Sequence, residues 1–145
     1  LTMGYPVGGE YEIWTTADGG DSWTKVSGSN IPNPTSGEFG IVNVYDKWGT
    51  QKLWFGTNKG RVYYTTDGGQ NWNVSTLDPN NTVSDVAFYD GNNGLAMTFI
   101  GTTTNAAVYA TNDGGATWIK DGVWFLVEGS AGLSAEQLLR LAASS

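Results

Sequence analysis

The chain has 145 residues, with no cysteine, no histidine and a formal net charge of −7 from 14 acidic and 7 basic side chains. The missing side chains exclude Ser-His-Asp and Cys-His catalytic groups, disulfides, and metal sites built on histidine or thiolate ligands. The acidic balance disfavours nucleic acid as a partner, because phosphate backbones are bound by clustered Lys and Arg.

The composition favours short strands joined by tight turns. Glycine accounts for 21 residues and aromatic side chains for 13% of the chain. Aromatic and β-branched residues favour strands, whereas Gly, Asn and Asp favour turns. No apolar run approaches the ~20 residues of a transmembrane helix, so membrane insertion is not expected. No signal peptide is recognisable in the sequence, which begins at Leu1.

In chain order, the apolar and aromatic runs predict groups of three, four and four strands. These strands are expected at 1–6, 10–16 and 23–26, then at 39–45, 52–57, 61–66 and 72–76, and then at 83–89, 94–100, 106–111 and 118–120. The run Val123–Val127 predicts one further strand. Trp14, Trp54 and Tyr63 fall within strands and are expected to pack between sheets.

One turn motif, Thr-x-Asp-Gly-Gly-x-x-Trp, occurs once in each group. Its defining residues are Thr16, Asp18, Gly20 and Trp23, then Thr65, Asp67, Gly69 and Trp72, then Thr111, Asp113, Gly115 and Trp118. Successive aspartates lie 49 and 46 residues apart, a spacing typical of propeller blades. The carboxylate can accept backbone N–H groups, the glycines allow positive φ, and the tryptophan can cover the apolar layer. We therefore expect structural aspartates and buried tryptophans.

The three copies resemble the Asp-box (BNR) repeat, S/T-x-D-x-G-x-x-W, of sialidases, sortilin-type receptors, some xyloglucan-degrading enzymes and photosystem II assembly factors. The resemblance covers about residues 5–121. It implies an all-β fold of β-propeller-type blades, each with four antiparallel strands. It also implies that the motif turns lie opposite the face where ligands usually enter. The sequence is similar to secreted Asp-box proteins of Bacteroidetes-type bacteria, which implies an extracytoplasmic location.

On this plan, residues 1–128 form three blades: about 1–28, lacking its first strand, about 38–77, and about 82–121, with an extra strand at about 123–127. Three blades do not close a ring, which needs at least ~4. The chain is therefore expected to be part of a longer propeller, or half of a six-bladed ring formed by a homodimer. In the dimer, the extra strand would complete the partner's first blade. A sandwich-like stack of sheets is a third alternative.

Residues 129–145 differ in composition and predict a short C-terminal helix. Ser134–Gln137 has a capping-box pattern, and Leu138 and Leu141 share one helical face. The helix is either a read-through tail or a docking element for an open blade face or a subunit interface. The candidate residues for an oligomer interface are Trp124, Phe125, Leu138 and Leu141.

Ligand or partner binding is expected at loops, because loops on a rigid scaffold commonly carry function. The candidate residues are Asn33, Glu38, Trp48, Asn58, Lys59, Asp78, Thr103 and Asn105. The stretch 102–105 is expected to be a loop, Trp48 is placed in a turn at 46–50, and the carboxylates are interpreted as solvated loop charges. Residues 90–94 are interpreted as a simple turn because they lack the full ligand pattern of a calcium loop.

The arginine count argues against sialidase activity, which occurs in one of the protein groups that share this motif. A sialidase needs three converging arginines, and this chain has only Arg61 and Arg140. We expect a non-enzymatic module without cofactor or metal that binds protein or glycan. The alternatives are a fragment of a glycoside hydrolase-type Asp-box propeller and a purely structural oligomerisation module.

Overall fold

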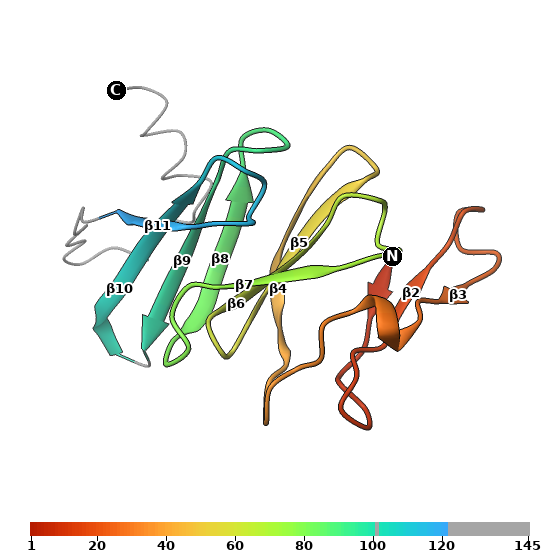
Figure 1. Cartoon of the computed structure of the whole chain (residues 1–145), viewed down its shortest axis with the longest axis horizontal. Helices are drawn as coiled ribbons and strands as arrows, with labels where there is room; N and C mark the ends of the chain where they lie inside the picture. The colour runs from red at the N-terminus through yellow and green to blue at the C-terminus, as the bar shows by residue number, and fades with distance from the viewer. Residues whose placement is uncertain (101, 122–145) are drawn as a thin grey trace.

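A computed structural model describes residues 1–100 and 102–121 (Figure 1). This part of the chain is all-β and forms three antiparallel sheets, which lie side by side along the long axis (Figure 1). The first sheet contains β1 (Thr2–Met3), β2 (Ile13–Thr15) and β3 (Thr24–Lys25). The second contains β4 (Gly40–Trp48), β5 (Lys52–Thr57), β6 (Arg61–Thr65) and β7 (Asn73–Thr76). The third contains β8 (Thr82–Phe88), β9 (Gly94–Ile100), β10 (Thr102–Thr111) and β11 (Ile119–Asp121).

Each sheet is a meander in which consecutive strands pair. The strands of the second and third sheets lie close to the expected positions. Those of the first sheet are shorter than expected, because the chain reverses in a tight hairpin between Val7 and Glu10, with Gly8 and Gly9 at positive φ. The short helix η1 (Gly28–Asn30) follows. Within the described residues, no helix has the length and apolar character needed to cross a membrane.

Two local expectations were wrong. Residues 102–105 belong to β10, because Thr102 pairs with Ile100 and a register shift accommodates the extra residues before Ala107. The turn expected at 46–50 is also shorter. β4 continues through Trp48, which pairs with Lys52, so only 49–51 form the turn.

An aromatic cluster joins the first and second sheets. The Tyr63 ring stacks on Phe55, with centroids 4.8 Å apart, and Tyr11 packs edge-on against both rings. The buried members of the cluster are Tyr11, Ile13, Val26, Ile31, Phe55, Tyr63 and Trp72. The burial of Tyr63 between sheets confirms its expected packing role.

A second cluster joins the second and third sheets. The Trp54 ring stacks on Phe88 with centroids 3.6 Å apart, and its indole N–H donates to the carbonyl of Gly114 at 2.6 Å. In the opposite direction, the Trp118 indole N–H donates to the Ser75 hydroxyl at 2.9 Å. The buried members are Val44, Trp54, Val62, Val83, Val86, Phe88 and Ala96. Trp54 therefore packs between sheets, as expected.

Trp23 was expected in the core, but 44% of its surface is exposed. Trp118 packs toward Ser75 of the sheet that precedes its own in the chain, and the buried Trp72 belongs to the cluster shared with the first sheet. Within the described residues, no sheet precedes the first one. No sheet in the described part of the chain is therefore placed to cover Trp23 as the second sheet covers Trp118.

The remaining C-terminal expectations lie outside the described residues. They are the extra strand at 123–127, the helix within 129–145, and the interface candidates Trp124, Phe125, Leu138 and Leu141.

Candidate functional site

The three motif turns share one hydrogen-bonding pattern and lie at one end of the sheets (Figure 1). In each, the threonine hydroxyl donates to the aspartate, at 2.7, 2.8 and 2.8 Å, and accepts the backbone N–H of the second glycine. The aspartate also accepts the backbone N–H of the residue four positions later. The second glycines have φ between 93° and 107°, a region that L side chains rarely adopt. Each carboxylate is therefore committed to its own turn.

These hydrogen bonds lower the pKa values of the aspartates. For Asp18 and Asp113, donation from the side chain and backbone of the residue four positions later holds the pKa below the usual range. For Asp67, partial burial raises the pKa, but hydrogen bonds from Asn71, Thr65 and Gln70 outweigh it and lower the pKa to about 2. All three groups are consequently charged near neutral pH and act as acceptors only.

We expect Asp67→Asn to weaken the dependence of stability on acidic pH. The folded-state pKa of Asp67 is lower than the unfolded value of 3.8, so its contribution is complete above pH 4 and is lost as pH falls toward 2. The difference should be about 1 kcal/mol, because solvent screens this partly exposed turn. Urea titrations at several pH values measure it. The exposed carboxylate Asp21 provides the control, and an equal loss of pH dependence in Asp21→Asn would contradict the assignment.

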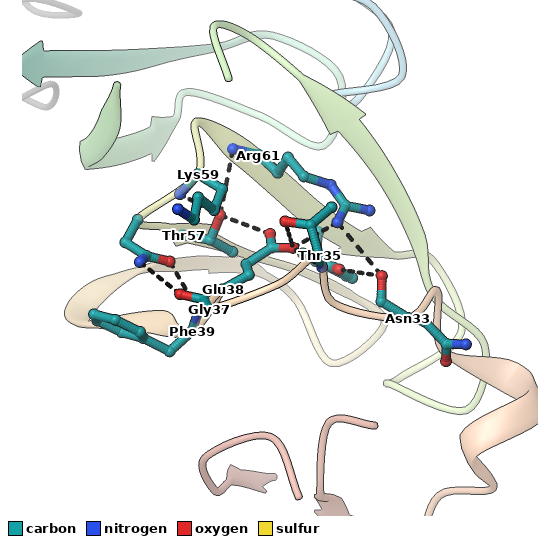
Figure 2. Close-up of polar contacts among 10 residues, drawn as sticks. Asn33, Thr35, Gly37, Glu38, Phe39, Thr57, Lys59 and Arg61 are labelled. Carbon is teal, nitrogen blue, oxygen red and sulfur yellow. Dashed lines mark hydrogen bonds and ion pairs between the residues drawn. The ribbon is translucent and has the colours of Figure 1, made fainter. Parts of the chain in front are cut away.

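A polar cluster lies at the end of the second sheet where β5 turns into β6, opposite the β6–β7 motif turn, and Figure 2 shows its contacts. The Glu38 side chain is completely buried and pairs with Arg61, whose side chain is 13% exposed. Its Oε1 accepts the Thr57 hydroxyl at 2.8 Å, and its Oε2 accepts the backbone N–H and hydroxyl of Thr35 as well as the guanidinium. Four donors thus compensate the buried carboxylate. The expectation that Glu38 is a solvated loop charge was wrong.

Aromatic rings border this ion pair. The Arg61 guanidinium carbon lies 5.1 Å from the centroid of the Tyr63 ring, within the range of a cation–π contact. Burial, reinforced by the charge of Glu38, raises the pKa values of Tyr11 and Tyr63 above their ordinary value. Both phenols therefore remain neutral near physiological pH and do not act as bases there. Within the described residues, no three acidic side chains gather into a group that could hold a metal ion.

The repeated turns and the antiparallel sheets that contain them agree with a comparison to known families. The family model described as Sortilin-Vps10 (Sortilin, neurotensin receptor 3) matches residues 11–123. The chain belongs to the Sortilin-Vps10 family. Members of this family are propellers of the Asp-box type, which agrees with the three motif turns and the antiparallel sheets.

A curated relative shares 32% identity with this chain over 118 residues. It is the photosystem II assembly lipoprotein Ycf48 of Synechococcus sp. (strain CC9902), and the match covers 79% of this chain. The chain spans 32% of that relative's length. This Sortilin-Vps10 family chain therefore corresponds to about a third of its relative.

The structure brings part of the predicted loop set together. Figure 2 shows the cluster formed where the segment before β4 meets the β5–β6 turn. The Asn58 side chain accepts from Phe39 N and donates to Gly37 O, and the Arg61 guanidinium donates to Asn33 O at 3.4 Å. Lys59 lies in the β5–β6 turn, where its backbone N–H donates to Thr57.

The remaining candidate loop residues lie outside this cluster or contact it only through backbone atoms. The N–H of Asp78 donates to Gly60 O at 3.4 Å, so the β7–β8 connection lies against the β5–β6 turn. Thr103 and Asn105 are in the early part of β10, at the same end of the third sheet as the start of β8. Trp48 is at the far end of β4, near the motif turns, and 49% exposed. It does not share a site with the others.

Several members of the polar cluster were missed at the sequence level. Arg61 and Thr57 lie in strands, and Thr35 lies in a loop rich in similar small polar residues. The spacing of 23 residues between Glu38 and Arg61 has no recognisable pattern. The available signal was that Arg61 is an arginine within an otherwise aromatic and β-branched strand.

Proposed function

We propose that this chain is a non-enzymatic β-propeller module whose loops recognise protein or glycan. The observation that carries the proposal is that three connecting segments meet at one end of the second sheet. They are the segment before β4, the β5–β6 turn and the β7–β8 connection. These loops are held by internal hydrogen bonds, and the Glu38 carboxylate is occupied by four donors. A carboxylate used in this way stiffens a platform and is poorly placed to exchange protons with a substrate.

The names of related proteins support a protein partner by analogy. The cyanobacterial relative is named as an assembly protein of photosystem II, and the family description includes a receptor. The same relative is named a lipoprotein, which supports an extracytoplasmic location for this chain. These are analogies at the level of the family, and the functional site must be tested on its own residues.

We further propose that the three sheets are blades of a larger ring. The remaining blades would come from a longer parent chain or from a second copy in a homodimer. The exposure of Trp23 supports this proposal, because the equivalent Trp118 and Trp72 contact the sheet that precedes their own.

The binding proposal is tested on glycan arrays and on a panel of plant and bacterial polysaccharides. Lys59→Glu is expected to weaken binding about tenfold or more, whereas Lys120→Glu, the same charge change on the exposed β11 strand, should leave it intact. Turnover of a polysaccharide that is lost in Asp78→Asn, while the far-ultraviolet circular dichroism of the variant is unchanged, would establish the glycoside hydrolase alternative. Absence of protein and glycan binding at every concentration would favour the structural module.

A further inference from the structure

Trp48 lies on the face of the second sheet that is directed toward the third sheet. It follows Asp46 by two residues, and Asp46 pairs with Trp54 of β5. Alternate residues of a strand and paired residues of neighbouring strands share one face of a sheet. Trp54 stacks on Phe88 of the third sheet, which identifies that face. The neighbouring sheet of Trp48 is therefore in place, and Trp48 is still 49% exposed.

The third sheet has an exposed aromatic residue, Tyr89, at the corresponding position. The first glycine of the following motif donates its N–H to Gln51 O in the second sheet and to Asn92 O in the third, at 2.8 Å in both. Trp48 precedes Gln51 by three residues, and Tyr89 precedes Asn92 by three. Tyr89 is 66% exposed. Both aromatic residues thus lie next to the β4–β5 and β8–β9 turns, at one end of the sheets (Figure 1).

Polar groups in a fixed arrangement accompany Trp48. Its cross-strand partner Lys52 donates to Gly91 O at 2.8 Å and to Asn92 Oδ1 at 3.1 Å. The lysine therefore holds the β8–β9 turn against the end of the second sheet. Asn92 is exposed, and because its oxygen faces the ammonium, its amide nitrogen remains a donor toward solvent. A Cβ atom at Gly49 would meet no heavy atom within 4 Å, so the space beside Trp48 is open.

From this arrangement we propose that Trp48 is the stacking platform of a second binding site, which takes a pyranose ring of a glycan chain. The C–H groups of a β-linked pyranose form an apolar face, and its hydroxyls project from the edge. An exposed indole beside amide and ammonium groups matches both features. A protein partner would instead need a contiguous apolar patch of several hundred Å². The neighbours of Trp48 along and across the strand are polar residues or glycine, namely Lys47, Gly49, Thr50 and Lys52.

The carboxylates of this region support binding without hydrolysis. Asp46 Oδ2 accepts the backbone N–H of Phe88 at 2.6 Å. Asp90 Oδ1 accepts the backbone N–H groups of Asn92 and Asn93, at 2.7 and 2.8 Å. Because both carboxylates hold backbone segments in place, neither is positioned to exchange protons with a glycosidic bond. The site lies at the opposite end of the second sheet from the loops proposed above, and it goes beyond their function.

The test titrates the whole 145-residue chain with cellohexaose, xylohexaose, mannohexaose and N-acetylchitohexaose in a calorimeter. We expect saturable binding of at least one oligosaccharide with a Kd below about 1 mM. Trp48→Ala should weaken this binding about tenfold or more, because it removes the stacking surface. Trp23→Ala is the matched control, because Trp23 is 44% exposed but belongs to the motif turn of the first sheet. It should leave the affinity unchanged.

Two further variants separate stacking from hydrogen bonding. Trp48→Tyr keeps an exposed aromatic ring and should retain most of the affinity. Asn92→Ala removes the amide donor and should weaken binding about threefold or more.

Three outcomes would overturn the proposal. They are the absence of saturation with all four oligosaccharides up to about 10 mM, equal affinities of the two tryptophan variants, and loss of binding in Lys59→Glu with full binding in Trp48→Ala. The last outcome would assign the sugar to the loops, so the proposed function would stand while this site would fail. Binding that is lost in Trp48→Ala and kept in Lys59→Glu would support this site independently of the loops.

Discussion

Glu38→Ala is expected to lower the free energy of unfolding by about 3–5 kcal/mol, because it leaves the largely buried Arg61 guanidinium without its counter-charge. The Thr35 and Thr57 hydroxyls would also lose their acceptor. Urea denaturation followed by far-ultraviolet circular dichroism measures the loss. Combining Glu38→Ala with Arg61→Met should cost less than the sum of the two single changes, because the double variant removes the uncompensated charge.

The matched control is the surface ion pair between Lys25 and Glu12, at 2.7 Å. Its side chains are 45% and 36% exposed, so Glu12→Ala should change stability by less than about 1 kcal/mol. Similar losses for Glu12→Ala and Glu38→Ala would contradict the view that burial makes the Glu38 pair essential to the loops it joins.

Trp54→Ala is expected to cost about 3–5 kcal/mol, the range for truncating a large aromatic side chain in a core. The change removes the ring stacked on Phe88 and the hydrogen bond to Gly114 O. It therefore affects the packing of the second sheet against the third as well as the motif turn that accepts the indole N–H. The same urea titration measures the loss.

Trp48→Ala is the control for truncation of a tryptophan. Its side chain lies at the end of β4 and is half exposed, so the loss should be below about 1 kcal/mol. The variant Trp54→Phe keeps an aromatic ring and removes the indole N–H. Its loss of unfolding free energy should lie between those of Trp48→Ala and Trp54→Ala. Equal stabilities of Trp48→Ala and Trp54→Ala would contradict the role of Trp54 in joining the sheets.

The repeated motif explains why the fold was largely predictable from the sequence. Each copy combines a glycine pair that needs positive φ with a strand pattern on either side, so the hairpins and the order of strands follow from local chemistry. The long β4 and β10 strands were harder to delimit. β4 continues past the expected turn until Trp48 pairs with Lys52, and β10 begins with a register shift against β9. No local pattern specifies either pairing.

The candidate site was less predictable because it depends on contacts between distant residues. The sequence around Glu38 indicates only a charged loop residue. Its burial depends on Thr57 of β5 and Arg61 of β6, which lie beside it in the fold and donate hydrogen bonds to it. Trp23 illustrates the opposite error. Its motif predicts burial, but burial also requires a neighbouring sheet, and an interface between sheets cannot be read from one repeat.

The two junctions between sheets differ in how they are joined. Indole N–H groups cross between the second and third sheets in both directions, from Trp54 and from Trp118. At the first junction, Leu1 lies against Gly69 as Trp54 lies against Gly115, and an aliphatic side chain has no N–H to donate. The first junction is crossed instead by the backbone N–H of Trp72, which donates to Asn30 O at 2.8 Å, and by the Gln70 side chain, which donates to the Thr15 hydroxyl at 3.3 Å. Each junction therefore has its own set of donors, and in an array stabilised by contacts between neighbouring units the couplings need not be equal.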